Sequence, residues 1–161
     1  MSRYEKAAEN NVSTYIGRKE IAECRECACF NLRKAARIVT QIYDGALRPT
    51  GIRATQFALL VHASVMGPVP LTKLAEAMAT DRTTLARNLE LLWKEGLLTI
   101  ENGKDRRSRI INITDGGLKK LAEAYPIWKR TQEEAKGIIG PGDWSEMLLR
   151  ISVVIDRLGR K

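Results

Sequence analysis

Hydroxyl, amide and guanidinium side chains follow one another between residues 82 and 94, at spacings that place them on one side of a helix. At about 100° per residue, the leucines of this segment share the opposite side. Arginine can donate two hydrogen bonds to a guanine edge, and threonine can contact a thymine methyl group. The pattern predicts DNA contacts from Arg82, Thr83, Thr84, Arg87, Asn88 and Lys94. Among these, Arg87 is the strongest candidate for reading bases, and Lys94 is expected to contact phosphate.

The apolar face of the same segment is expected to point toward the core. It carries Leu85, Leu89, Leu92 and Trp93. Asp81 is a suitable N-cap, because its carboxylate can accept a hydrogen bond from an unpaired backbone N–H. Gly96 supplies the C-terminal stop. A shorter helix over 73–79, capped by Thr72, comes before it. Two short helices joined by a tight polar turn predict a helix-turn-helix.

A basic loop follows between two segments that alternate like strands, Leu97–Ile100 and Arg109–Ile113. Its cations are Lys104, Arg106, Arg107 and Arg109. Phosphates and a narrow minor groove both attract such cations. Asp105 would repel DNA if it pointed outward, so we expect it to pair with Arg107 and to brace the loop. A hairpin with a charged tip after a helix-turn-helix is typical of a winged helix-turn-helix DNA reader.

Helices are also predicted on the N-terminal side of this unit. Residues 1–20 are polar and show no sustained periodicity of apolar residues. Apolar residues recur at three- and four-residue steps over about 22–46 and again over about 55–65, as in amphipathic helices. Between these two predicted helices, Pro49 and Gly51 favour a turn.

Two further helices are predicted after the hairpin. Thr114 is placed to cap the first, and Pro126 is expected to kink it or to mark a boundary within it. Gly140 opens the break before the last helix, where Asp143 and Glu146 have capping-box spacing. The fold class is therefore mainly α, a winged helix-turn-helix with a small β-hairpin wing and additional helices at both ends.

Composition narrows the class of protein. The 161 residues include 27 Lys and Arg against 19 Asp and Glu, a formal net charge of +8, which favours a partner with negative charge. No apolar run approaches the ~20 residues that span a bilayer, and the N-terminus lacks the apolar core of a signal peptide. We therefore expect a cytoplasmic protein. A single histidine, with no glycine-rich phosphate loop and no nucleophile signature, argues against an enzyme.

The sequence resembles the multiple-antibiotic-resistance regulator (MarR) family of bacterial transcription factors over about residues 25–158. The most specific pieces are the run Asp81–Arg87 and the motif Asp105-x-Arg107 that leads to Ile113-Thr114-Asp115-Gly116. The order of the predicted elements also agrees with the family. The resemblance implies a homodimer in which the N-terminal helix and the last two helices pack against those of the partner. It also implies binding of double-stranded DNA at a roughly palindromic operator.

With these expectations the chain divides into four regions. They are a polar N-terminal arm over 1–21, a dimerisation helix over 22–50, a winged helix-turn-helix over 51–115 and C-terminal dimerisation helices over 116–161. The wide apolar stripe of the last helix supports the dimer, because one chain of this size would cover it poorly. Most family members are repressors that small phenolic ligands or cysteine oxidation release from DNA.

Three cysteines, Cys24, Cys27 and Cys29, allow three interpretations. A metal site is disfavoured, because Cys27 and Cys29 diverge by ~200° on a helix and so cannot converge on one ion. Oxidant sensing is the second, since a thiol near a helix N-terminus and close to cations is activated. Here Cys29 and Tyr43 resemble the organic-hydroperoxide-sensing branch of the family, although two other tyrosine positions of that branch hold Arg33 and Ala54. The third is a structural role as small hydrophobes, with Cys27 or Cys29 packed at the dimer interface.

A small aromatic molecule is the alternative signal. The usual ligand pocket of the family lies where the dimerisation helices meet the reader. The residues of this chain that could line it are Tyr43, Phe57, His62 and Trp128. We therefore expect a homodimeric, sequence-specific transcriptional regulator, most simply a repressor, without metal or cofactor. The alternative from a different class is a winged-helix module that serves only protein assembly and binds no operator.

Overall fold

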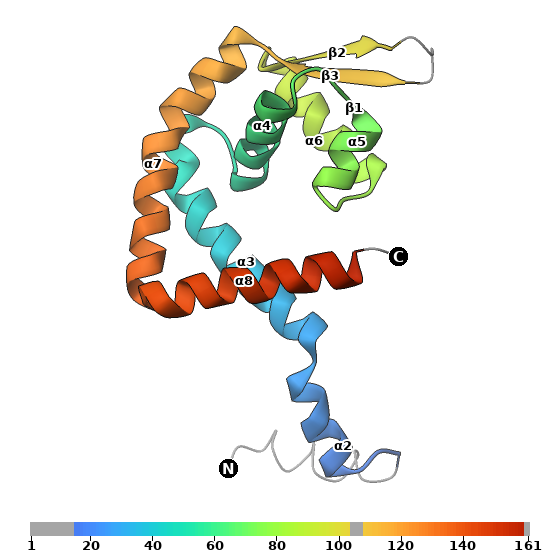
Figure 1. The fold of residues 1–161 in the computed structure, drawn as a ribbon, viewed down its shortest axis with the longest axis vertical. Helices are drawn as coiled ribbons and strands as arrows, with labels where there is room; N and C mark the ends of the chain where they lie inside the picture. Colours follow the sequence, from blue (N-terminus) through green and yellow to red (C-terminus); the bar gives the residue numbers. More distant parts are fainter. Residues whose placement is uncertain (1–14, 104–107, 160–161) are drawn as a thin grey trace, which may run out of the picture. The chain divides into compact units, whose positions relative to one another are not determined.

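The computed structural model describes residues 15–103 and 108–159, in one part that ends at Gln41 and another that begins at Ile42 (Figure 1). The first part holds α2 (Arg18–Glu23), the 3-10 turn η1 (Cys24–Glu26) and the beginning of α3 (Ala28–Leu47). One helix over 22–46 was predicted, and this is wrong at its N-terminal end. Cys27 has a ψ of 113°, outside the helical range, and neither proline nor glycine announces that break in the sequence.

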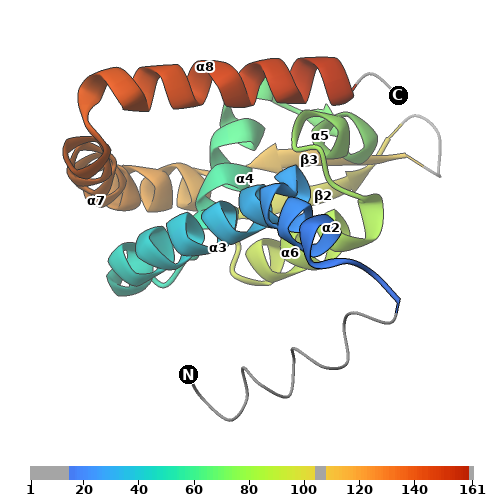
Figure 2. The same ribbon diagram turned by 90° about the horizontal axis from the view of Figure 1, so that it is seen from below.

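The second part is mainly helical and includes a small sheet, as predicted. After α3 its elements are η2 (Arg48–Thr50), α4 (Ala54–Met66), β1 (Val69–Pro70), α5 (Leu71–Ala77), α6 (Arg82–Lys94), β2 (Leu98–Asn102), β3 (Arg109–Ile113), α7 (Asp115–Ile139) and α8 (Pro141–Leu158). Helices α5 and α6 form the helix-turn-helix, and the β2–β3 hairpin extends from it as the wing (Figure 1). Figure 2 shows α8 leaving the end of α7 as a separate straight helix.

The sheet is antiparallel, with β3 between β1 and β2. The hairpin pairs Leu98 with Ile113, and Ile100 with Ile111. The strand β1, which pairs Val69 with Ile111, was not predicted. Its two residues include a proline, which cannot donate to the ladder, and its pairing partner is distant in the sequence. A segment this short carries no alternation from which to recognise a strand.

Leucines at helical spacing form the centre of the reader. Leu85, Leu89 and Leu92 of α6 are at most 2% exposed, together with Leu74 of α5 and Ile111 of β3. Trp93 was predicted to face this core, but it is 51% exposed, so this prediction is wrong. On a helix Trp93 lies ~40° beyond Leu89, at the margin of the apolar face, and much of its indole therefore stays outside.

Two predicted caps are present. The Asp81 carboxylate accepts a hydrogen bond from the backbone N–H of Thr84 (2.8 Å), and the Thr114 hydroxyl accepts one from that of Gly117 (3.0 Å). Gly96 ends the turn after α6 with a φ of +70°, a conformation that glycine adopts without strain. The reader is therefore bounded by the residues that the sequence indicated.

Two other predicted caps are wrong, and Pro126 marks no boundary within its helix. The N-cap of α5 is Pro70, which places Thr72 inside the helix. Pro141 starts α8 and Gly140 is its N-cap, so Asp143 and Glu146 form no capping box. Helix α7 continues through Pro126 as one element of 25 residues. In the first and second cases a proline with fixed φ sets the helix start and overrides the side-chain signal.

Within residues 15–103 and 108–159, no helix is long and apolar enough to span a membrane.

Candidate nucleic-acid interface and the adjoining cavity

The N-terminal half of α6 presents its polar residues to solvent. Thr83, Thr84 and Arg87 are exposed, as is Arg82 at the start of the helix. Asn88 is half-buried and donates a hydrogen bond to the carbonyl of Thr84 (3.0 Å), which fixes its amide against the helix. The predicted recognition residues therefore share one accessible surface, with the buried leucines behind them.

Asp81 secures the first turn of α6. Hydrogen bonds from the side chain and then from the backbone N–H of Thr84 lower the pKa of Asp81 below its ordinary value. The carboxylate is therefore charged at neutral pH and faces the positive end of the helix dipole. This cap fixes the start of α6 and therefore the positions from which the Thr83 and Thr84 side chains project.

Lys94 lies at the other end of α6 and has a partner within the helix. Its Nζ is 2.8 Å from Glu90 Oε1, and the hydrogen bond from Lys94 lowers the pKa of Glu90. Both side chains are more than half exposed. An exposed pair of this kind contributes little to stability. Lys94 can therefore release the Glu90 carboxylate and bind another anion instead.

The tip of the wing is outside the described residues. This holds for Lys104, Asp105, Arg106 and Arg107, so the predicted brace is not described. Arg109 is described, exposed, at the beginning of β3 opposite Asn102. It lines a surface hollow together with Glu90 and Trp93 of α6. The base of the wing thus places one of the four predicted wing cations beside the C-terminal half of α6.

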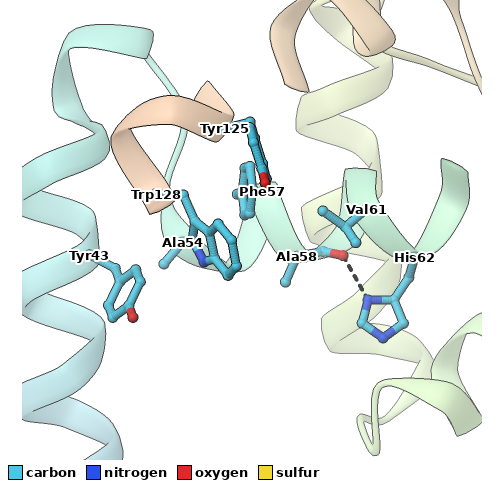
Figure 3. Close-up of a pocket in the computed structure, with 8 residues that line it drawn as sticks. All are labelled: Tyr43, Ala54, Phe57, Ala58, Val61, His62, Tyr125 and Trp128. Carbon is cyan, nitrogen blue, oxygen red and sulfur yellow. Dashed lines mark hydrogen bonds between the residues drawn. The ribbon is translucent and has the colours of Figure 1, made fainter. Parts of the chain in front are cut away.

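A cavity of about 420 Å³ lies between α3, α4 and α7 (Figure 3). Its lining residues are Tyr43, Ala54, Phe57, Ala58, Val61, His62, Tyr125 and Trp128. The structure thus brings together the four residues named from the sequence as candidate pocket residues. Its volume lies within the range of small-molecule sites, which are about 300–1,000 Å³.

Stacked rings form one wall of the cavity. The Trp128 ring centroid is 5.8 Å from that of Phe57 and 5.9 Å from that of Tyr125, with interplanar angles of 23° and 28°. Tyr125 was missed in the sequence, although it precedes Trp128 by three residues and so shares its helix face. Offset stacks of this kind are favourable beyond the area that they bury.

Two polar side chains of the cavity are already hydrogen-bonded. The Tyr43 hydroxyl donates to Gln132 Oε1, and burial raises the pKa of Tyr43, which keeps the hydroxyl protonated. His62 Nδ1 lies 2.8 Å from the carbonyl oxygen of Ala58. Gln132 was also missed, although it follows Trp128 by four residues on α7. The cavity therefore has apolar walls and two polar groups that are held in place.

The three cysteines are exposed free thiols. The single chain does not bury them, so a structural role would require packing at a dimer interface. Cys27 immediately precedes α3, and Cys29 lies in its first turn. Cys29 and Tyr43 are many turns apart on this helix, where only positions three or four apart are neighbours, so they do not meet within one chain. Among the described residues no group of three His, Cys, Asp or Glu side chains is arranged to hold a metal ion.

Comparisons with known proteins agree with this architecture. No family model matches the chain. The transcriptional regulator MosR of M. tuberculosis, solved in complex with DNA, is 38% identical; the match covers 80% of this chain and 93% of that one, with a TM-score of 0.74. The repressor NicR of Pseudomonas putida is 26% identical over 126 residues, 78% of this chain and 80% of its own length.

A second solved structure has the same fold. MarR of E. coli superposes with a TM-score of 0.65 at 16% identity, over 80% of this chain and 96% of that one. Together with the exposed polar face of α6 and the adjoining wing, these likenesses identify the chain. It belongs to the MarR family of winged helix-turn-helix, DNA-binding transcriptional regulators.

Proposed function

We propose that this chain is a homodimeric, sequence-specific transcriptional repressor that inserts α6 into the major groove. The observation that carries the proposal is the exposed triad of Thr83, Thr84 and Arg87 in the N-terminal half of α6. Helix-turn-helix readers make their base contacts from this part of the second helix. Two relatives support it, since MosR is solved with DNA and NicR is described as a repressor.

The contacts divide into those that choose sequence and those that supply affinity. Arg87 is proposed to read a guanine edge, with Thr83 and Thr84 beside it. Lys94 and Arg109 are proposed to meet phosphates, as are the wing cations Lys104, Arg106 and Arg107, with Asp105 bracing the loop. Phosphate contacts release counterions, so binding should weaken steeply as salt rises.

The apolar surface of α8 supports the homodimer. None of its described residues is buried in the single chain. Its exposed apolar side chains include Leu148, Ile151, Val154, Ile155 and Leu158. A continuous apolar stripe of this extent marks an interaction surface. A two-fold dimer then presents two copies of α6, which requires an operator with two related half-sites.

The cavity is proposed to receive the signal. Helix α4, on its wall, also packs against the sheet and against α5 and α6 in the reader. Helix α7, which also lines the cavity, starts at the base of the wing. A molecule that binds between α4 and α7 can therefore shift the reader with respect to the C-terminal helices. Such a ligand shifts the equilibrium between two arrangements of the reader only as far as its affinities for those two arrangements differ.

Oxidation of Cys29 is the second candidate signal, favoured by its exposure in the first turn of α3. The Cys29 thiolate would attack one oxygen of an organic hydroperoxide. A sulfur–oxygen bond forms and the oxygen–oxygen bond breaks, and the departing alkoxide takes up the proton that the thiol gave to solvent, so that an alcohol leaves. The sulfur is oxidised to a sulfenic acid and the peroxide is reduced.

This step can be tested by adding organic hydroperoxide to the protein bound to DNA. Wild type should release the DNA and Cys29→Ser should not. If both proteins respond equally, Cys29 is excluded as the sensor.

Selection of bound sequences from random duplex DNA tests the proposed function. A repressor of this kind should enrich one motif with two-fold related half-sites about one helical turn apart. If no sequence is enriched, the winged-helix unit serves protein assembly instead.

A further inference from the structure

Glu90 is an acidic residue on the face of α6 that is proposed to enter the major groove. At ~100° per residue, it lies ~20° from Thr83 and ~60° from Arg87 around the helix axis. Its side chain is 56% exposed. A hydrogen bond from Lys94 lowers the pKa of Glu90, so the carboxylate is charged at neutral pH. Phosphates repel a negative charge on this face, so attraction to the DNA backbone does not account for Glu90.

Two cations near this carboxylate are themselves proposed to bind phosphates. Lys94 Nζ lies 2.8 Å from Glu90 Oε1, and Arg109 at the base of the wing lines the same surface hollow as Glu90. When Lys94 and Arg109 turn to the DNA backbone, the carboxylate is left facing the bases. A carboxylate that enters the groove loses water, and this loss is costly unless a hydrogen-bond donor replaces the water. Glu90 therefore needs an N–H group on a base.

The major groove offers a carboxylate only two such donors. Guanine presents N7 and O6 and thymine presents O4, all of which are acceptors, whereas cytosine and adenine present amino groups. In adenine the N7 acceptor lies beside the amino group and repels the second oxygen of a carboxylate. Cytosine presents its N4 amino group without a neighbouring acceptor of its own. Cytosine is therefore the base that fits Glu90, and guanine and thymine are rejected by repulsion between acceptors.

The spacing of Glu90 from Arg87 agrees with contacts to neighbouring base pairs. Three residues advance a helix by ~4.5 Å, close to the ~3.4 Å between successive base pairs. In some helix-turn-helix readers, base contacts recur along the second helix at steps of three and four residues. We infer that Glu90 determines specificity by accepting a hydrogen bond from a cytosine amino group, beside the guanine that Arg87 reads. This inference rests on the proposed function, because it adds a second base-reading residue to α6.

Selection from random duplex DNA with wild type and with Glu90→Gln tests the inference. A glutamine side chain pairs with N6 and N7 of adenine. The two selected motifs should therefore agree except at one position of each half-site, where cytosine changes to adenine. The variant keeps the length of the side chain, and an exposed ion pair contributes little to stability, so the fold should be retained.

Fluorescence anisotropy then measures the preference on defined duplexes. Replacing that C·G pair by T·A in one half-site should weaken wild-type binding about tenfold or more. Glu90→Ala, which has neither donor nor acceptor at this position, should bind the two duplexes within about twofold of each other.

Glu76 provides a matched control in the first helix of the reader. Its Oε2 lies 2.8 Å from Lys73 Nζ, and its side chain is 64% exposed, so it forms the same kind of pair as Glu90. Glu76→Gln removes the same charge from α5, which crosses the DNA backbone in this class of reader and does not enter the groove. A general gain in affinity from the lost charge should appear in both variants. A change in the preferred base should appear in Glu90→Gln alone.

The outcomes separate this inference from the proposed function. If wild type enriches a motif that neither Glu90 variant alters, or if both variants only bind every duplex more tightly, Glu90 reads no base and the inference alone is refuted. If wild type enriches no motif, the proposed function is refuted, and the inference with it.

Discussion

The Thr114 hydroxyl donates a 2.7 Å hydrogen bond to the carbonyl oxygen of Gly96 and so joins the beginning of α7 to the turn that ends α6. The Thr114 hydroxyl oxygen also accepts a hydrogen bond from the backbone N–H of Gly117 (3.0 Å). Gly117 has no room for a side chain, since a Cβ there would lie 2.2 Å from the carbonyl oxygen of Leu97. The recognition helix, the wing and α7 therefore meet at one tightly packed point.

Removing this hydroxyl should destabilise the protein. Thr114→Val keeps the shape of the side chain but loses both hydrogen bonds, and we expect the free energy of unfolding to fall by about 1 kcal/mol. Urea denaturation measures this change. Thr114→Ser keeps the hydroxyl and should stay close to wild type. Equal loss in both variants would indicate that packing of the methyl group, and not the cap, matters here.

The turn between α5 and α6 contains a strained residue. Ala79 has a φ of +47°, in the left-handed region that costs a non-glycine residue about 1–2 kcal/mol. Its side chain is exposed, so replacing the methyl group sacrifices no packing. Ala79→Gly should raise the free energy of unfolding by roughly 1 kcal/mol, after allowance for the freer unfolded chain. Ala79→Val should lower it, and a destabilised Ala79→Gly would show that the turn is not strained.

The reader could be predicted from the sequence because local signals agree there. The period of Leu85, Leu89 and Leu92, the Asp81 cap and the Gly96 stop all depend on neighbours within a few residues. Predictions failed where distant partners or proline decide the structure. Strand β1 exists only through its pairing with β3, and Pro70 and Pro141 displace the caps predicted at Thr72 and Asp143.

The candidate site was likewise predictable only where signals within one helix decide. The stripe of α7 that holds Trp128 was readable, but the accompanying Tyr125 and Gln132 were passed over, although both share its helix face. The aromatic stack and the bond between Tyr43 and Gln132 need three helices to assemble. Helical spacing indicates which residues share a face, but not which of those faces leave a cavity.

Acid should weaken the cap of α6. Because hydrogen bonds from Thr84 lower the pKa of Asp81 in the folded chain, this carboxylate stabilises the fold fully above its unfolded pKa of about 3.9. The contribution is lost as pH falls through the lower folded value. Urea denaturation between about pH 5 and pH 2 should show a steeper loss of stability for wild type than for Asp81→Asn. Parallel curves for the two proteins would exclude this linkage.

The apolar stripe of α8 should hold the dimer together. Ile155 is 62% exposed in the single chain, and Ile155→Glu would place a carboxylate in the proposed interface. Sedimentation velocity should then show a monomer where wild type is a dimer. Arg157→Glu, on the polar face of the same turn, is the control and should remain dimeric. A dimeric Ile155→Glu would move the interface away from this stripe.

The most direct test of DNA reading by α6 compares wild type and Arg87→Ala on two duplexes, the one selected from random DNA and a scrambled version of it. Fluorescence anisotropy measures the affinities over a range of salt concentrations. If Arg87 reads a base, its loss should cost about 1–3 kcal/mol on the selected duplex and little on the scrambled one, with the salt slope nearly unchanged. Lys94→Ala should instead weaken both duplexes similarly and reduce the slope by about one unit. If Arg87→Ala binds the selected duplex as tightly as wild type, or loses affinity equally for both, α6 does not read DNA through the face described here.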